Sequence, residues 1–332
     1  MKLFMSSQTF TQLYTLFLLI PITLSAPAAA DSKCLRPSIR KEWRKLSSRQ
    51  KMAYHNAVKC TKEKASRISS DGQSKSTLED FTYVHLKLRK SVHHVASFLP
   101  WHRWFLAMYA SELENCGYTD PMPYWDWTLD SGTTQAFINS EIFHPVHGFG
   151  SLGFTEACVE DGPYAGMQSN LPEPHCLKRG FNLSITEPGQ WTASNTRGIM
   201  RYPDFLGLWN KTERLLHDKV HNAIGGDMLE HYSPNDPLFY LHHAQIDRIW
   251  TLWQGRNQTR ISDYTGNAIQ NATTNMAGLG DIMTVLGLAQ NRTVESVMDT
   301  QANGLCYTYD DEGEQLPAIL EINMSDRDII VQ

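Results

Sequence analysis

The stretch SFLPWHRWFLAMYASELENCG, residues 97–117, places a single histidine, His102, among large apolar and aromatic side chains. Pro100 suits the first turn of a helix, where its missing N–H would have no partner in any case. The apolar residues that follow recur at helical spacing towards a core: Trp101, Trp104, Phe105, Met108 and Tyr109. We therefore expect His102 near the start of a buried helix. A lone histidine there is more often a packed core residue than a functional one, so a functional role requires partners elsewhere in the chain.

Composition indicates a globular protein with a secretory leader. The chain has 332 residues, of which 41% are hydrophobic and 20% charged, and its formal net charge of −5 argues against nucleic acid as a partner. Residues 1–30 contain Lys2, the apolar stretch LYTLFLLIPITL and the small residues SAPAAA, which together predict a cleaved signal peptide rather than a membrane span. The mature chain, residues 31–332, is then expected to form one domain and to be secreted.

Cysteines and glycosylation sequons agree with secretion. The chain holds 6 cysteines at spacings unlike those of a zinc finger, so we predict disulfides. Six cysteines allow fifteen pairings. We favour Cys158–Cys176, which closes a local loop, Cys60–Cys116, which links two helix ends, and Cys34–Cys306, which joins the termini. Sequons start at Asn182, Asn210, Asn257, Asn271, Asn291 and Asn323.

The hydrophobic pattern predicts a mainly α-helical protein with long loops and few short strands. Apolar residues at helical spacing favour helices over residues 38–66, 78–96, 97–117, 202–223 and 237–254. Between residues 130 and 200 the chain is rich in glycine and proline and is expected to be irregular. Neither a repeat nor a domain linker interrupts this pattern, so one mainly α domain is the simplest organisation.

Histidines gather in two groups on the predicted helices: His85, His93, His94 and His102, then His217, His221, His242 and His243. In HDKVH, two imidazoles four residues apart project from one helix face and can reach one ion. Ligation by imidazole alone suits copper, zinc, iron or nickel. A zinc protease is disfavoured because Asp218 stands where the His-Glu-x-x-His motif needs a glutamate. Three histidines from each group instead suggest two ions that face each other.

Four motifs resemble signatures of the tyrosinase, catechol oxidase and hemocyanin family of dinuclear copper proteins. They are FLPWHRWF, MPYWDW, HDKVHNAIGGDM and SPNDPLFYLHHAQIDRIW, and they occur in the family's order over residues 36–310. The resemblance implies a central four-helix bundle that holds two copper ions. It assigns one ion to His85, His93 and His102, and the other to His217, His221 and His243. His94 and His242 then become packing or supporting residues.

The resemblance also implies the chemistry of an oxidase. Phenols or catechols are converted to ortho-quinones with dioxygen, and Glu213, one turn before His217, is the expected base acting through water. The alternative for Glu213 is an exposed helix residue beside Arg214. Asp218 and Asn222 occupy positions that the family links to activity on monophenols. Asp218 either raises the pKa of Glu213 by like-charge repulsion or serves as a second base.

Two further positions bear on the resemblance. Ser91 stands where many fungal members carry a cysteine joined to a copper ligand by a thioether, so that crosslink is expected to be absent. Tyr307 and Tyr309 resemble the motif that closes the catalytic domain, with Arg40 as the arginine stacked against it.

Two functions remain open at this stage. The first is an oxidase in pigment or specialised-metabolite formation, which acts on a small phenol or catechol, or on a tyrosine in a peptide, with dioxygen. The second is a hemocyanin-like protein that binds dioxygen without turnover because substrates cannot reach the site. The size of the chain and its predicted secretion favour the enzyme. No nucleic-acid or membrane partner is expected.

Overall fold

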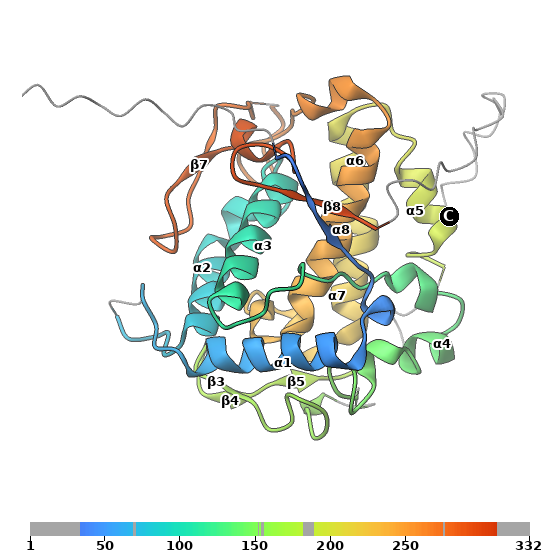
Figure 1. Cartoon of the computed structure of the whole chain (residues 1–332). Coiled ribbons are helices and arrows are strands. Elements are labelled where there is room, and N and C mark those ends of the chain that lie inside the picture. The colour runs from blue at the N-terminus through green and yellow to red at the C-terminus, as the bar shows by residue number, and fades with distance from the viewer. Residues whose placement is uncertain are drawn as a thin grey trace, which may run out of the picture.

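The computed structural model describes residues 34–68, 71–151, 153, 156–181, 189–274 and 276–310. Within them the chain is mainly helical with a few short strands, as the sequence predicts (Figure 1). The predicted signal peptide, residues 1–30, and the sequons at Asn182 and Asn323 lie outside the described residues. None of the described helices is both long and apolar enough to cross a membrane.

Four helices form the centre of the molecule (Figure 1). α2 (Thr77–Val92) and α3 (Phe98–Glu114) pack against each other, and α3 also packs along α8 (Leu238–Gly255). α7 (Asp218–Ile224) completes the group. Most residues of α3 and α8 are buried, because both helices carry apolar and aromatic side chains on nearly every face. The predicted central four-helix bundle is therefore confirmed.

Local signals account for where two of these helices begin. Ser76 Oγ accepts a hydrogen bond from Glu79 N at the start of α2. Asp236 Oδ1 accepts one from Leu238 N at the start of α8. Each side chain satisfies a backbone amide that has no partner inside its own helix.

The predicted helix over residues 202–223 is present but changes its winding. α6 (Phe205–Lys211) runs into a single π-helical turn over Thr212–His217, and α7 continues from there. Turns of this kind are frequent at functional sites. This one carries Glu213 and His217.

The prediction of one helix over residues 38–66 is wrong in its first part. β1 (Ser38–Arg40) and a short 3-10 turn come before α1 (Ser48–Glu63), which starts at Ser47 with a capping box. β1 pairs in parallel with β8 (Tyr307–Tyr309), and the two strands cross the face of the bundle together (Figure 1). Because the partner strand lies at the other end of the chain, local periodicity could not reveal it.

The remaining elements are short and lie between the main helices. The short strands form three antiparallel pairs. In these, β2 (Ala157–Cys158) pairs with β5 (Lys178–Arg179), β3 (Gln168–Ser169) pairs with β4 (His175–Cys176), and β6 (Ile282–Met283) pairs with β7 (Arg292–Thr293). Two short helices are α4 (Thr134–Ile138) and α5 (Ala193–Ile199). The 3-10 turns are Trp43–Lys45, Trp127–Asp130, Glu141–Phe143, Gly226–Leu229, Ser233–Asn235, Gln258–Ile261 and Glu295–Val297.

All 6 cysteines form disulfides, and the three pairings are those predicted: Cys34–Cys306, Cys60–Cys116 and Cys158–Cys176. The first pair joins the segment before β1 to the segment before β8. The second joins α1 to the segment after α3, and the third joins β2 to β4.

A buried polar cluster joins the chain ends to the central helices. Arg40 of β1 stacks on the ring of Tyr307 at 3.5 Å, as the resemblance implies. Asp247 of α8 accepts hydrogen bonds from Tyr307 Oη at 2.7 Å, Tyr309 Oη at 2.5 Å and Arg103 Nε at 2.6 Å. Burial alone would raise the pKa of Asp247, but the guanidinium groups of Arg103 and Arg40 hold it below its ordinary value. Since Arg103 lies on α3, the cluster fixes α3 against α8.

Candidate metal centre

The first histidine cluster lies between α2 and α3. His85 comes from α2 and His102 from α3, while His93 directly follows α2 in the segment that leads to α3. One nitrogen atom from each of the three rings lies within 4.8 Å of the others. His85 and His102 are buried, whereas His93 is only partly buried. His93 is therefore the least buried residue of this cluster.

The second cluster holds four histidines, one more than predicted. His217 ends the π-helical turn, His221 lies on α7, and the neighbours His242 and His243 lie on α8. One nitrogen atom from each ring lies within 4.8 Å of the others, and all four residues are buried. The additional member is His242, which the sequence interpretation placed among the packing residues. Its signal in the sequence was the adjacent pair of histidines.

The two clusters face each other. The rings of His102 and His243 stack with centroids 4.3 Å apart and 12° between their planes. The centroids of His93 and His217 are 5.8 Å apart. The ring of Phe98 lies 4.7 Å from both His102 and His217 and forms an apolar wall between them. All six histidines predicted as ligands are thus brought to one place.

Hydrogen bonds fix the orientation of most of the rings. Four Nδ1 atoms lie at hydrogen-bond distance from a backbone carbonyl oxygen, which can only accept, so we assign the proton to Nδ1. The pairs are His85 with His231 at 2.8 Å, His93 with Arg89 at 3.0 Å, His102 with Phe98 at 2.8 Å and His221 with Met228 at 2.5 Å. Each of these rings therefore carries its lone pair on Nε2.

These lone pairs suit a bound metal ion. The Nε2 atoms of His85, His102 and His217 are buried and have no hydrogen-bond partner among the described residues. Burial lowers the pKa of His85 to about 3, and burial with neighbouring imidazoles lowers those of His102 and His221 well below the ordinary value. Neutral imidazoles held through Nδ1, with Nε2 left unpaired, are the usual arrangement of histidine metal ligands. The residues present therefore fit the two copper ions that the resemblance implies.

Glu213 is buried within the molecule and does not lie exposed beside Arg214. Its Oε1 accepts a hydrogen bond from His94 N at 2.6 Å, and its Oε2 accepts one from Trp209 Nε1 at 2.8 Å. Burial, together with the nearby carboxylate of Asp218, raises the pKa of Glu213 to about 8. The carboxyl group can therefore gain or lose a proton near neutral pH. Trp209 is a partner that the sequence did not indicate.

Asp218 and Asn222 lie on α7 beside the second cluster. Asp218 Oδ1 lies 2.9 Å from His217 Nδ1 and accepts a hydrogen bond from that ring. Burial acts to raise the pKa of Asp218, but the bond with His217 holds it below its ordinary value. Of the two roles expected for Asp218, the repulsive effect on Glu213 agrees with this geometry. Asn222 is partly buried next to His221, and its role stays a prediction.

His94 connects the first cluster to Glu213. Its backbone has a φ of 53°, in the left-handed region that residues other than glycine rarely adopt. Its amide donates to Glu213, and its carbonyl oxygen accepts a hydrogen bond from Asn267 Nδ2 at 2.8 Å. These two contacts hold the segment that carries His93.

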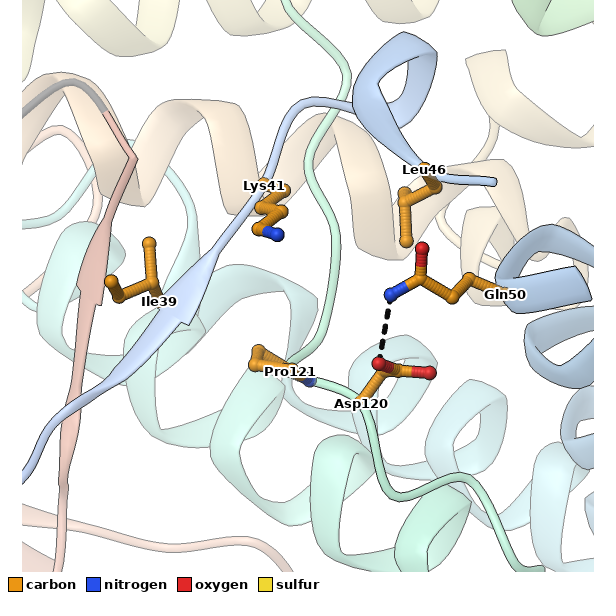
Figure 2. A pocket seen from close by; sticks show the side chains of 6 residues that line it. All are labelled: Ile39, Lys41, Leu46, Gln50, Asp120 and Pro121. Atoms are coloured by element: carbon orange, nitrogen blue, oxygen red, sulfur yellow. Dashed lines mark hydrogen bonds between the residues drawn. The ribbon is translucent and has the colours of Figure 1, made fainter. Parts of the chain in front are cut away.

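A separate cavity of about 300 Å³ lies beside β1 (Figure 2). Its walls include a hydrogen bond from Gln50 Nε2 to Asp120 Oδ1, and its lining residues are Ile39, Lys41, Leu46, Gln50, Asp120 and Pro121. No residue of either histidine cluster lines it. The cavity is therefore not part of the candidate metal centre.

Comparison with known proteins agrees with this geometry. The common central domain of tyrosinase matches residues 75–256, a range that contains both histidine clusters. The chain belongs to the tyrosinase family. Tyrosinase ustQ of Aspergillus flavus is 39% identical over 296 residues, which cover 83% of this chain and 80% of that tyrosinase.

Two more relatives extend the comparison. The tyrosinase-like protein phomQ1 of Diaporthe leptostromiformis is 36% identical over 312 residues, which cover 84% of this chain and 79% of the relative. The solved structure of a mutant polyphenol oxidase from Thermothelomyces thermophila superposes with a TM-score of 0.74 at 27% identity, over 82% of this chain and 88% of that one. This member of the tyrosinase family is therefore a tyrosinase-like oxidoreductase.

Proposed function

We propose that the protein is a secreted, copper-dependent oxidase that converts phenols or catechols to ortho-quinones with dioxygen. It would act in pigment or specialised-metabolite formation, and a tyrosine in a peptide is a further substrate class. A signal peptide over residues 1–30 and one tyrosinase-like copper domain over residues 31–332 belong to this proposal. The observation that carries it is the pair of facing clusters, in which the Nε2 atoms of His85, His102 and His217 are buried and unpaired.

In this proposal His85, His93 and His102 hold one copper ion, and His217, His221 and His243 hold the other. His221 Nε2 and His243 Nε2 lie 3.4 Å apart, which supports their pointing at one ion. Bound copper supplies the binding of dioxygen and its two-electron reduction. The chain supplies the rings and the surface against which a substrate rests, and hydrogen bonds at Nδ1 orient five of the six rings.

The substrate is proposed to approach beside His93. His93 is only partly buried, whereas His102, His217 and His243 are buried. The ring of Phe98 lies against His102 and His217, where it provides an apolar surface for a phenol ring and keeps water away. Every other histidine of the two clusters is buried within the described part of the chain.

Glu213 is the proposed base that takes the proton of a monophenol through a bound water. His94 N and Trp209 Nε1 hold its two oxygen atoms in fixed positions. Its raised pKa, about 8, gives it a higher proton affinity than an exposed glutamate has. Positive charge on the two ions would favour its ionised form and so prepare it to accept the proton. Asp218 and Asn222 are proposed to adjust this step, Asp218 through the pKa of Glu213.

The experiment that tests the proposal uses the mature protein loaded with copper. Addition of 4-methylcatechol is expected to produce quinone absorbance together with oxygen consumption, and 4-methylphenol tests the hydroxylation step. The same protein stripped with a copper chelator is the control, and it is expected to be inactive. Reversible uptake of dioxygen without quinone from either compound would contradict the proposal and favour the hemocyanin-like alternative.

A further inference from the structure

The loop between α8 and β6 is bound to the segment that carries His93. Asn267 O accepts a hydrogen bond from Ala96 N at 2.9 Å, and Asn267 Nδ2 donates one to His94 O at 2.8 Å. Gln270 Nε2 donates to His93 O at 3.3 Å. The loop therefore lies directly beside the first histidine cluster.

The tip of this loop is a tight turn. Ala272 N donates to Ile269 O at 3.1 Å and closes the turn over Gln270 and Asn271. Asn271 has a φ of 62°, in the left-handed region, which asparagine tolerates better than most residues do. Gln270 is partly buried against the backbone of His93, whereas Asn271 is exposed. The turn thus presents Asn271 to solvent, one residue away from a contact with a predicted metal ligand.

Asn271 also begins an N-glycosylation sequon, Asn-Ala-Thr, that ends at Thr273. All three of its residues are exposed, so a glycan there displaces no packed side chain. The sequon that begins at Asn210 differs, because Asn210 is partly buried and its Thr212 has 0% exposure. The structure therefore favours Asn271 over Asn210 as an attachment site.

We propose that Asn271 carries an N-linked glycan that screens the approach to His93 and restricts the enzyme to small phenols, catechols and short peptides. The inference rests on the proposed function, which supplies both the secretion and the approach of the substrate beside His93. An N-linked glycan is bulky and hydrophilic, and its anchor lies next to Gln270, the residue that binds the carbonyl group of His93. A small aromatic ring passes beside such a chain of sugars, whereas a tyrosine on the surface of a folded protein is kept away.

The first test locates the glycan. The full chain is produced in a eukaryotic host that attaches N-linked glycans, and the secreted protein is digested and treated with a peptide N-glycosidase in heavy-oxygen water. The glycosidase converts each glycosylated asparagine to an aspartate that carries the heavy oxygen, so mass spectrometry identifies the site. We expect the label at Asn271, and its loss in Thr273→Ala, which breaks the sequon without changing Asn271. Absence of the label at Asn271 in the secreted protein would overturn the inference, whereas a chain that is not secreted would contradict the proposed function.

The second test compares two substrates that share a catechol group and differ in bulk. One is 4-methylcatechol, and the other is the same catechol coupled to dextran, both offered to the copper-loaded protein. We expect Thr273→Ala to raise kcat/KM for the dextran-bound catechol by ~10-fold and to change that for 4-methylcatechol by no more than about 2-fold. Equal change with both substrates, or no change with either, would overturn the screening role. Oxidation of neither substrate by any form of the protein would contradict the proposed function, while the mass measurement still decides whether Asn271 is glycosylated.

Thr259→Ala is the matched control, because it removes the exposed sequon that begins at Asn257. Asn257 lies beyond the end of α8, and His243 lies about 18 Å before that end, at 1.5 Å per residue of helix. We expect this variant to oxidise the two substrates at the wild-type ratio. A rise with the dextran-bound catechol as large as that of Thr273→Ala would show that glycans slow bulky substrates wherever they are attached, and would overturn the role assigned to Asn271.

Discussion

The two histidine clusters present the same kind of donor on different supports. In the first, two helices supply His85 and His102, but His93 lies outside them, on a segment held at His94 by Glu213 and Asn267. In the second, every histidine belongs to a helical segment and is buried. Under the proposed function, the buried second cluster would retain its ion more firmly, and the less buried His93 would leave room for a substrate.

The largest expected effect comes from a variant that disables one half of the candidate metal centre. His93→Ala leaves two imidazoles in the first cluster, which hold copper weakly, so we expect the copper content to fall from two ions to one per chain. Oxidation of a catechol should then fall to the rate of the copper-free protein. Metal analysis after dialysis and an oxygen electrode provide the two measurements. Full copper content and full activity in this variant would show that His93 is not a ligand, and His94→Ala is the matched control that should retain both ions.

Glu213 connects the two halves, because it follows α6 near the second cluster and binds the amide of His94 beside the first. Glu213→Gln keeps the shape of the side chain but removes the base. We expect hydroxylation of a monophenol to slow by ~10²–10⁴-fold, while oxidation of the matching catechol slows much less. The two rates are measured at saturating oxygen with copper content checked. Equal slowing of both substrates would indicate that Glu213 only supports the structure.

Loss of the contact between α3 and α8 should affect both histidine clusters, because α3 carries His102 of the first cluster and α8 carries His243 of the second. Asp247→Ala leaves the buried guanidinium groups of Arg40 and Arg103 without their carboxylate, so we expect a loss of about 3–5 kcal/mol of unfolding free energy. Chemical denaturation of the copper-free protein measures it. Glu156→Ala, which removes an exposed partner of Lys178, is the control and should cost about 0–1 kcal/mol. Similar losses in both variants would mean that the buried cluster contributes little.

The smallest expected effect is a change in unfolding free energy at His94, which lies in the segment that carries His93 of the first cluster. His94 adopts a φ of 53°, which a glycine adopts without steric cost. We expect His94→Gly to raise the unfolding free energy of the copper-free protein by about 1 kcal/mol, whereas His94→Ala should not raise it. Thermal unfolding of the two variants side by side is sufficient. A loss of stability in His94→Gly would show that contacts of the imidazole outweigh the backbone strain.

Features that depend on local spacing were predictable. The helix expected over residues 97–117 is α3, Phe98–Glu114, and the helix expected over residues 237–254 is α8, Leu238–Gly255. The helical spacing of His217 and His221 likewise indicated that their rings share a face. The six histidines predicted as ligands come together because the helices that carry five of them are fixed by such patterns.

Features that depend on distant partners were not predictable. The π-helical turn over Thr212–His217 has no simple sequence signal, and it decides where Glu213 points. The buried position of Glu213 depends on the amide of His94, which lies 119 residues away in the chain. The spacing of His242 and His243 could not show that both rings enter the same cluster, because adjacent residues on a helix usually face different directions.

The disulfide Cys34–Cys306 has a topological consequence. It joins residues separated by 272 positions, so nearly the whole described chain forms one covalent ring that contains both histidine clusters. A protease that cuts a single surface loop within this ring releases no fragment. The cut gives the molecule a new pair of ends, as circular permutation does, and every helix of the bundle stays attached to the others.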